Sequence, residues 1–455
     1  MLSKVASFMF LPIAALFMGK SEFGSLSFIY PLIIAGQGIL TFGLGIGFLK
    51  HLTGKGRDVY VLKFNVFLIW FCCNLIVFLS ISGAINTGII NDYMVGSYYI
   101  KDIFLISYVS ASTLSYIGIF LQESQAEGNA LKYVIINTGV KLIFIMLVLF
   151  SFVGLDAILT IQIIIILLVT NSLFFLYCFI SMMKSFKLVF DWPLSKELIH
   201  IGFPIFISAS VTLISAFSGR LFLNNESGIS LVADFSLMLI LSQSILLFYT
   251  TYSRIYIPAL FRKLNNGKAF AKKLLQISVP LLCLLGFYTT SLIYLFFLYV
   301  VNNYVENYDF PVWSFGILIG SYIMYPLYIS FVDILSFMKK SKILMYINIS
   351  IMLYHLISGY FLVAYLGVLG AAISFFTMML AQCFLVYYYS SKLISINQML
   401  KPVLANLIFF FLLIYITSLI NESMTIILFF IVLCISIIHF YLKKDSVLKL
   451  LKELG

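Results

Sequence analysis

The sequence Ile-Gly-Phe-Pro at 201–204 opens an apolar run that closes with Ser-Gly-Arg-Leu at 218–221 and the turn Asn-Asn-Glu-Ser-Gly at 224–228. A second apolar run starts at Leu231 and ends in a basic segment, 254–263, with three arginine or lysine residues. Each run is long enough to cross the roughly 30 Å hydrocarbon core of a bilayer as a helix. This stretch therefore predicts two membrane-spanning helices joined by a short turn and followed by a basic loop.

The composition of the whole chain extends this interpretation from end to end. Of its 455 residues, 62% are hydrophobic and 10% are charged, whereas about 25% charged residues is usual in soluble domains. Apolar runs long enough to span a membrane recur throughout the sequence. A membrane β-barrel would need short segments of alternating hydrophobicity, and the sequence has no such period. The predicted fold class is an all-α polytopic membrane protein.

The apolar runs predict about fourteen transmembrane helices. The first is interpreted as a membrane span and not as a signal peptide, although its shortness is compatible with an upstream start of the chain. The expected spans, with boundaries good to a few residues, are 2–18, 23–49, 59–82, 101–121, 131–153, 157–182, 199–223, 230–258, 273–300, 312–337, 342–364, 366–390, 401–420 and 424–442.

Lysine and arginine residues fall almost entirely on one side of this topology. With a cytoplasmic N-terminus, 23 of the 28 lie in cytoplasmic loops and helix ends, Lys63 among them, and only Lys20 and Lys101 lie outside. The three that remain within spans are Lys141, Arg220 and Arg254. Because short cytoplasmic loops of membrane proteins are rich in Lys and Arg, the distribution predicts cytoplasmic N- and C-termini.

The charge and the cysteines exclude several other classes of function. The net charge of +11 is spread over short loops, which favours membrane topology over nucleic-acid binding. All six cysteines fall within predicted spans, so we expect neither a disulfide framework nor a metal site. No loop is long enough for a soluble catalytic domain, and nucleotide-binding and hydrolase motifs are missing from the sequence. The chain is therefore predicted not to be an enzyme and not to be an ATP-driven pump by itself.

A weak internal repeat divides the chain into two halves. Residues 25–40 align with 231–246 at an offset of 206, and residues 131–142 align with 344–355 at an offset of 213. Six helices return the chain to the same side of the membrane, so the halves would be parallel repeats about an axis along the membrane normal. We expect two six-helix lobes around a central cavity, with an extra C-terminal helix pair. The predicted parts are an N-terminal lobe (1–183), a cytoplasmic linker (184–198), a C-terminal lobe (199–391), and a helix pair with a basic tail (392–455).

The opening stretch resembles the polysaccharide (O-antigen type) flippases of the MATE-like multidrug, oligosaccharidyl-lipid and polysaccharide exporter superfamily. That family has a Gly-x-Pro helix start, an arginine near the helix end, a glycine loop and a long helix closing on Pro-x-Leu. The matching positions are Gly202, Pro204, Arg220, Gly228, Pro258 and Leu260, with further matches at Gly24, 42–45 and 366–373. Two departures are Gly219, where the family often has Asp, and the acidic segment 123–127, where its loop is usually basic.

The resemblance implies a flippase for an undecaprenyl-diphosphate-linked oligosaccharide, such as an O-antigen, capsule or lipopolysaccharide repeat unit. It implies a multi-pass protein of the bacterial plasma (inner) membrane that works by alternating access. The implied partners are the lipid-linked oligosaccharide, membrane lipids, and the polymerase and chain-length machinery of polysaccharide biosynthesis, with no nucleic acid. No cofactor is expected, and coupling to H⁺ or Na⁺ is left open.

Ionisable groups within spans are costly, which makes them candidates for function. Lys141 lies about ten residues into its predicted helix, about 15 Å deep, with Asn137 one turn away. Its functional interpretation is a contact with the lipid diphosphate in the cavity, and the alternative is a structural pair with a neighbouring helix. His355 lies at a similar depth, where the repeat aligns it beside the counterpart of Lys141, and the alternative is a packing residue.

Three further charged residues lie in or near spans, and two of them have two interpretations each. Arg220 either faces the cavity or extends to the outer interface. Arg254 is interpreted mainly as an interfacial anchor. Asp333 is either an ion-coupling carboxylate or the ion-pair partner of Lys339 and Lys340, with the ion pair favoured.

Four amide side chains fall in the middle of predicted spans. Each would either line a hydrophilic cavity or join helices by hydrogen bonds. These residues are Gln37, Asn74, Gln243 and Gln382.

Two other classes of membrane protein compete with a flippase. An ion-coupled exporter of small organic cations, in the same superfamily, would favour acidic cavity groups, whereas the candidates here are mostly basic. A glycan polymerase or ligase would also be polytopic, but such an enzyme typically carries a large outer loop, which this sequence lacks.

Overall fold

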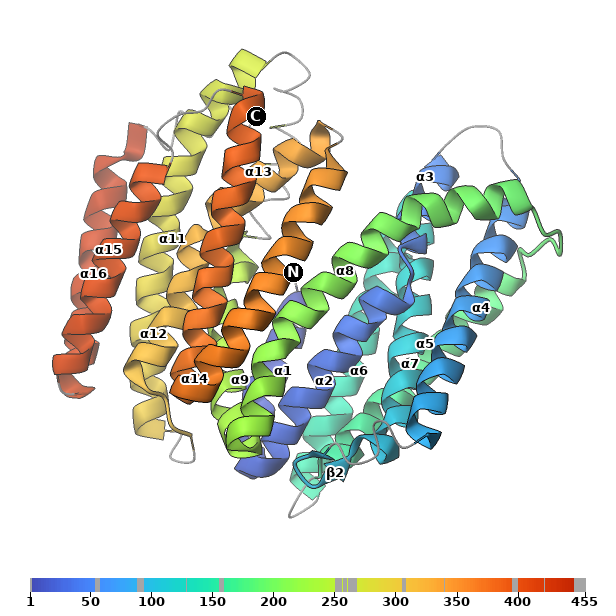
Figure 1. Ribbon diagram of the computed structural model, residues 1–455, viewed down its shortest axis with the longest axis horizontal. Helices are drawn as coiled ribbons and strands as arrows, with labels where there is room; N and C mark the ends of the chain where they lie inside the picture. Colours follow the sequence, from blue (N-terminus) through green and yellow to red (C-terminus); the bar gives the residue numbers. More distant parts are fainter. Residues whose placement is uncertain are drawn as a thin grey trace. The chain divides into compact units, whose positions relative to one another are not determined.

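The computed structural model of the chain is an all-α membrane protein, as the composition predicted (Figure 1). Eleven helices among the described residues are long and apolar enough to span a membrane. The structure describes residues 2–53, 58–87, 94–127, 129–154, 159–249, 256, 260, 268–304, 308–338, 340–394, 400–420 and 422–445. The helix fold is therefore confirmed along most of the chain.

The chain divides into two compact units. Unit 1 comprises Met1–Phe217 and Gly228–Ala233, and unit 2 comprises Ser218–Ser227 and Asp234–Gly455. The helices from the N-terminus to the unit boundary are α1 (Leu2–Phe17), α2 (Lys20–Leu40), α3 (Leu44–Thr53), α4 (Val59–Asn86), α5 (Ile100–Ala126), α6 (Ala130–Gly154), α7 (Thr160–Met183) and α8 (Trp192–Ser227). A short hairpin, β1 (Met94–Val95) and β2 (Tyr98–Tyr99), connects α4 to α5.

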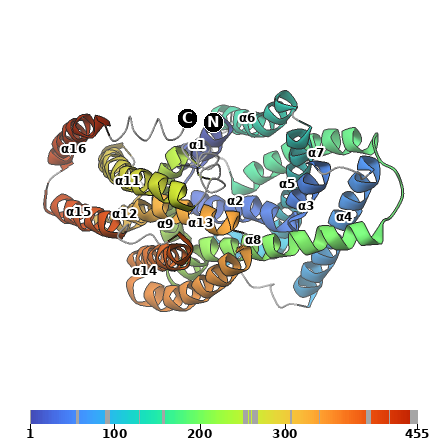
Figure 2. The same ribbon diagram turned by 90° about the horizontal axis from the view of Figure 1, so that it is seen from above.

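The remaining elements belong largely or wholly to unit 2. They are α9 (Ile229–Gln243), α11 (Lys268–Tyr304), α12 (Val312–Gly320), the 3₁₀ turn η1 (Ser321–Met324), α13 (Tyr325–Phe337), α14 (Ser341–Ile394), α15 (Leu400–Leu419) and α16 (Glu422–Leu442). In an apolar stretch of 18 residues within the span at 312–335, 78% of the residues are buried, against 11% in the corresponding stretch of the span at 424–442. The segment α12–η1–α13 is therefore central to unit 2, whereas α16 lies at its edge, beside α11 (Figures 1 and 2).

The span predicted at 23–49 is wrong as a single helix, because the structure breaks it into α2 and α3. Phe42 and Gly43 both have left-handed φ values, 49° and 68°. A Cβ on Gly43 would overlap the carbonyl oxygen of Gly202 in α8, and a Cβ on Gly202 would lie 2.6 Å from the carbonyl oxygen of Phe42. The break is thus a place where two backbones cross, and only glycine at both positions permits the contact.

Helix α8 begins at Trp192, seven residues before the predicted start at 199. The Asp191 carboxylate accepts a hydrogen bond from the backbone N–H of Leu194 at 3.0 Å, so Asp191 is the N-cap of the helix. Pro193 follows in the first turn, where its missing N–H is tolerated. The end of the predicted linker is therefore helical.

Two other predicted spans are interrupted. The span at 312–337 contains η1, where the Ser321 hydroxyl donates a hydrogen bond to the carbonyl of Leu318 at 2.6 Å. Pro326 follows shortly after η1 and has no backbone N–H to donate. The span at 230–258 is interrupted at Ser244, whose N–H donates to the carbonyl of Leu241 at 3.2 Å. The end of that span, with Arg254, lies largely outside the described residues.

Helix α14 contains both spans predicted at 342–364 and 366–390. They are joined at Gly367, which has φ 54° and ψ −128°. Hydrogen bonds between Ser374 and His355 and between Gln382 and Asn348 join the two arms in antiparallel register. A Cβ on Gly370 would overlap the carbonyl oxygen of Leu362, so the arms touch closely beside the turn. We call this pair of arms the α14 hairpin.

Candidate functional site

The predicted cation of unit 1, Lys141, lies one residue from the middle of α6. Lys141 and Asn137 are both half-buried. The position in the helix agrees with the depth expected from the sequence. A contact between Lys141 and a substrate stays a prediction.

A buried ionic cluster at the predicted cytoplasmic end of unit 1 was missed by sequence reasoning. The Lys63 amine lies 2.5 Å from a carboxylate oxygen of Glu123 and 3.8 Å from one of Glu127. It also donates to the Ser185 hydroxyl at 3.2 Å. The side chains of Lys63 and Glu123 are only 8% and 3% exposed. Lys63 thus lies at the helix end to which the charge pattern assigned it, but the pattern did not predict that α4, which begins at Val59, buries this lysine against α5.

The same end of α4 holds the segment that links α7 to α8. Buried Asn65 donates to the Val189 carbonyl at 2.9 Å, and its amide oxygen accepts from the Asp191 N–H and the Ser195 hydroxyl, both at 3.0 Å. Both the amide nitrogen and the amide oxygen of Asn65 thus form hydrogen bonds with the segment that links α7 to α8. The segment 184–198, predicted as a cytoplasmic linker, thus belongs to unit 1.

An exposed ion pair adds to this attachment. The Lys187 amine lies 3.0 Å from the Asp58 carboxylate, which also caps α4 by accepting from the Tyr60 N–H at 3.0 Å. The hydrogen bond from Lys187 lowers the pKa of Asp58. Because this carboxylate is exposed, the pair is a small contribution to stability.

Two of the predicted cavity amides lie in unit 1. Asn74 is buried, and its amide nitrogen donates to the carbonyls of Trp70 at 2.8 Å and Leu40 at 3.2 Å, while its amide oxygen accepts from the Ser112 hydroxyl at 3.1 Å. Leu40 is the last residue of α2, so Asn74 satisfies a carbonyl released by the helix break. Gln37 is half-buried, and its amide nitrogen lies against Gly118 of α5.

Arg220 belongs to a buried polar cluster of unit 2. Its Nε donates to the Ser236 hydroxyl at 2.9 Å, and the residue is 4% exposed. Tyr322 of η1 interacts electrostatically with Arg220 and forms a hydrogen bond with Gln243. Two predicted site residues, Arg220 and Gln243, are thus brought together through one tyrosine. Arg220 is buried within the protein, so the expectation that it extends to the interface is not supported.

Asp234 near the start of α9 was also missed by sequence reasoning. It is 1% exposed, and its carboxylate accepts from the Asp309 N–H at 3.2 Å. The signal was present in the sequence, as an acid in the middle of the run Leu-Val-Ala-Asp-Phe at 231–235.

His355 and Gln382 lie on opposite arms of the α14 hairpin. The Nδ1 atom of His355, which is 3% exposed, is 2.8 Å from the Ser374 hydroxyl. The Gln382 amide donates to the Asn348 side chain at 3.1 Å and to the Tyr328 hydroxyl at 3.2 Å. Both predicted site residues therefore join helices within unit 2, and their contact with a substrate stays a prediction.

Asp333 of α13 carries a buried carboxylate oxygen, Oδ2, with no hydrogen-bond partner among the described residues. Tyr256, Tyr325 and Tyr328 lie close enough to interact with it electrostatically. Within the described part of the chain, no ion pair joins Asp333 to Lys340, and Lys339 lies outside that part. A buried carboxylate with an open oxygen is a place where a proton or a small cation can bind.

An apolar groove of about 440 Å³ lies between α11, α15 and α16 in unit 2. At one end the Tyr288 hydroxyl lies 3.0 Å from Nδ1 of His439, and Asn406 donates to the Cys283 carbonyl at 3.0 Å. The walls are mainly Leu284, Phe287, Phe409, Leu412, Leu413, Ile416, Val432 and Ile435. No group of three His, Cys, Asp or Glu residues that could hold a metal occurs among the described residues.

Comparison with solved structures identifies the fold. Lipid II flippase MurJ, in an inward closed conformation, matches with a TM-score of 0.67 and 15% identity over 98% of this chain and 99% of that one. An inward-facing multidrug resistance MATE transporter of the MOP superfamily matches with a TM-score of 0.63 and 13% identity over 87% and 94%. A mutant of the Vibrio cholerae MATE transporter VcmN matches with a TM-score of 0.56 and 15% identity over 88% and 96%.

The sequence itself matches no known family model and no curated protein. The chain has the fold shared by MATE transporters and the MurJ flippase, as the resemblance implied at the level of the superfamily. At such low identities the likeness concerns the fold, and the function has to be argued from the site.

Proposed function

We propose that the chain is a flippase that moves an undecaprenyl-diphosphate-linked oligosaccharide from the cytoplasmic to the outer face of a bacterial plasma membrane. The repeat unit would be that of an O-antigen, a capsule or a related polysaccharide. Transport would proceed by alternating access, without ATP hydrolysis by this chain and without a cofactor.

The observation that carries the proposal is the apolar groove between α11, α15 and α16. A substrate with a long hydrocarbon tail needs such a groove, because its tail stays in the bilayer while its head group crosses. This supports a lipid-linked substrate over a small soluble one.

The head group of such a substrate carries a diphosphate, which favours cationic partners. Lys141 in the middle of α6 is the first candidate, and Arg220 and His355 are the corresponding groups in unit 2. Arginine suits a diphosphate because its guanidinium donates two parallel hydrogen bonds, whereas lysine acts as a point charge. Asn137, Gln37, Asn74, Gln243 and Gln382 would contribute polar contacts for the sugars.

We assign the coupling of transport to Asp333. Its buried Oδ2 has no hydrogen-bond partner among the described residues, so binding of H⁺ or Na⁺ there would stabilise one conformation over another. The polymerase and chain-length proteins of the same biosynthesis would act on the outer product.

The proposal is tested by complementation. The gene is deleted in its host, surface polysaccharide and the lipid-linked intermediate are measured, and the strain is complemented with wild type, Lys141→Ala or Lys392→Ala. Lys392 is the matched control, because it is an exposed lysine at the end of α14. We expect loss of long-chain glycan with cytoplasmic accumulation of the intermediate, rescue by wild type and Lys392→Ala, and no rescue by Lys141→Ala at equal protein levels.

A second variant addresses the groove. Ile416→Trp would fill the groove and Ile437→Trp, on the exposed side of α16, would not. The flippase proposal expects the first to impair complementation and the second to leave it intact. Equal complementation by both would refute the role of the groove.

The alternative function, an ion-coupled exporter of small organic cations, is favoured by Asp333. A buried carboxylate with an open oxygen is also a binding group for a cationic substrate. Normal surface glycan in the deletion strain, together with altered sensitivity to cationic drugs, would establish this alternative over the flippase.

A further inference from the structure

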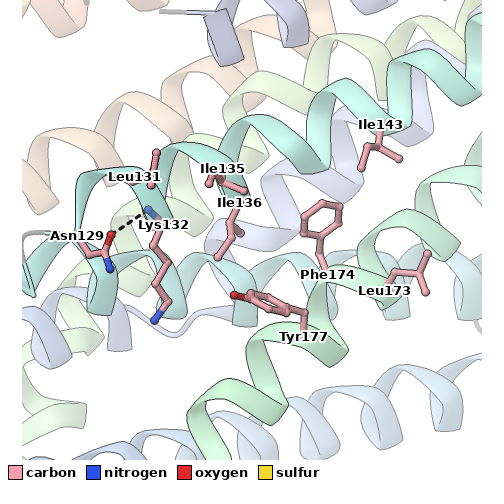
Figure 3. Close-up of a pocket in the computed structure, with 9 residues that line it drawn as sticks. All are labelled: Asn129, Leu131, Lys132, Ile135, Ile136, Ile143, Leu173, Phe174 and Tyr177. Carbon is pink, nitrogen blue, oxygen red and sulfur yellow. Dashed lines mark hydrogen bonds between the residues drawn. The ribbon is translucent and has the colours of Figure 1, made fainter.

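A second groove, between α6 and α7 in unit 1, has no part in the proposed transport of substrate (Figure 3). Its volume is about 680 Å³. Six of its lining residues are apolar: Leu131, Ile135, Ile136, Ile143, Leu173 and Phe174. The other three are polar: Asn129, Lys132 and Tyr177. In Figure 3 the amine of Lys132 and the hydroxyl of Tyr177 point toward the same end of the groove.

The groove is as long as one leaflet of a bilayer. Lys132 and Ile143 are eleven residues apart in α6, which corresponds to about 16 Å at 1.5 Å per residue. Half of the roughly 30 Å hydrocarbon core is about 15 Å. Lys132 lies near the start of α6, the end that the predicted topology places at the cytoplasmic head groups, and Ile143 lies near the middle of the helix.

The walls of the groove include exposed apolar side chains, which in a membrane-spanning helix are expected to face the hydrocarbon. Leu131, Ile135 and Leu173 are 72%, 58% and 62% exposed within the protein. The ring of Phe174 lies against Gly139, where a Cβ would be 3.3 Å from the ring edge. The missing side chain of Gly139 lets the edge of this ring approach α6 closely.

The charge of Lys132 is available to a ligand. Its amine lies 4.3 Å from the centre of the Phe120 ring, and no ion pair includes it among the described residues. The neighbouring acids Glu123 and Glu127 both form ion pairs with Lys63, and Glu123 interacts with Lys132 only electrostatically, without an ion-pair contact. An anionic head group at this end of the groove would therefore meet a lysine that no described carboxylate contacts directly.

We propose that the α6–α7 groove binds an anionic glycerophospholipid of the leaflet that surrounds the start of α6. The lipid phosphate would lie against the Lys132 amine and the Tyr177 hydroxyl. One acyl chain would run along Ile135 and Phe174 as far as Ile143. None of the residues that line this groove is among the proposed substrate contacts, and the proposal does not depend on the proposed flippase function.

The test measures lipids retained by the purified full-length protein, by native mass spectrometry. The probes are phosphatidylglycerol, diacylglycerol with the same acyl chains, and inorganic phosphate. Lys132→Gln removes the charge, and Leu173→Trp fills the groove. Lys392→Gln is the matched control, because the Lys392 amine also lies over an aromatic ring, 4.0 Å from the centre of Tyr388, but lines neither of the two grooves.

We expect Lys132→Gln to lower phosphatidylglycerol retention about fivefold, as for one lysine against an anionic lipid, and to leave diacylglycerol retention unchanged. Leu173→Trp should lower both, and Lys392→Gln neither. Equal retention by wild type and both groove variants would overturn the proposal. Displacement of the lipid by inorganic phosphate alone would overturn it too, as would stronger retention of a polyprenyl diphosphate than of phosphatidylglycerol. Equal thermal stability of the variants verifies that folding is unaffected.

Discussion

Unit 1 and unit 2 each bury acidic side chains in the membrane region, but the partners of these side chains differ between the two units. In unit 1, Glu123 is paired with Lys63, and that lysine also contacts Glu127 and Ser185. In unit 2, Asp333 has no ion-pair partner among the described residues, and its Oδ2 has no hydrogen bond there. Glu123 Oε2 also has no hydrogen-bond partner among the described residues, so the ion pair is what distinguishes the two acids. A buried charge that is paired stabilises the contact between helices, whereas a buried acid without a described cation is able to take up a proton or a cation. We therefore expect the first to matter for stability and the second for transport.

The largest effect should come from breaking the pair in unit 1. Lys63→Met leaves the Glu123 carboxylate buried without its cation, so we expect a loss of about 3–5 kcal/mol in the free energy of unfolding. Thermal unfolding of the detergent-purified protein measures it. Glu123→Leu in addition to Lys63→Met should recover most of the loss, because no unpaired charge remains. A single variant as stable as wild type would show that the pair contributes no stability.

A smaller effect is expected where unit 1 joins helices through a neutral amide. Asn74→Leu removes the hydrogen bonds to the carbonyls of Leu40 and Trp70, and should destabilise by about 1–3 kcal/mol. Thr87→Val is the matched control, because the Thr87 hydroxyl at the exposed end of α4 bonds only locally, to the Ala84 carbonyl. If both variants unfold at the same temperature, the role of Asn74 at the helix break is wrong.

Asp333→Asn in unit 2 should raise the stability of the protein, whereas the two preceding variants of unit 1 lower it. Removing a buried charge without an ion-pair partner is expected to raise the free energy of unfolding by about 1 kcal/mol, while transport loses its dependence on the coupling ion. Stability and ion-dependent uptake into vesicles are measured on the same preparation. If the variant is destabilised and its transport still depends on the ion, then Asp333 has a structural role, as we expect for Glu123 in unit 1, and not a role in coupling.

The smallest effect concerns the exposed pair of unit 1. Because the hydrogen bond from Lys187 lowers the pKa of Asp58, folding is favoured above the ordinary aspartate pKa of about 3.9. That contribution is lost as the pH falls through the lowered pKa of the folded state. Asp58→Asn keeps the helix cap and removes the charge, so the difference in Tm from wild type should be small at pH 7 and vanish in acid. A difference that grows in acid would contradict this sign.

Hydrophobic run length predicted the helices well, because a span must be about twenty apolar residues long whatever it packs against. The breaks inside spans were not predictable in the same way. The break at 41–43 depends on Gly43 meeting Gly202, which is 159 positions away in the sequence. By contrast, the early start of α8 was readable in the order Asp191-Trp-Pro193, which is a helix cap followed by a proline in the first turn.

The environments of the charged residues were likewise only partly predictable from the sequence. Charge distribution predicted that lysines gather at one end of the helices, but it could not tell buried Lys63 from its exposed neighbours. Two acids four residues apart at the end of α5, Glu123 and Glu127, were the available signal. They were interpreted as a departure from a family pattern, and the structure shows them to be the partners of that lysine.

The α14 hairpin has a consequence for how the protein is made. Its two arms are joined by a turn at Gly367 with no charged residue beside it, and lysines stand at the far ends of both arms, Lys342 and Lys392. Such a pair is expected to leave the ribosome and enter the membrane together, as one inserted unit. His355 would then already face Ser374, and Gln382 would face Asn348. The polar side chains would then enter the hydrocarbon already hydrogen-bonded to their partners. This would happen before the part of unit 2 that follows the hairpin in the sequence has been synthesised.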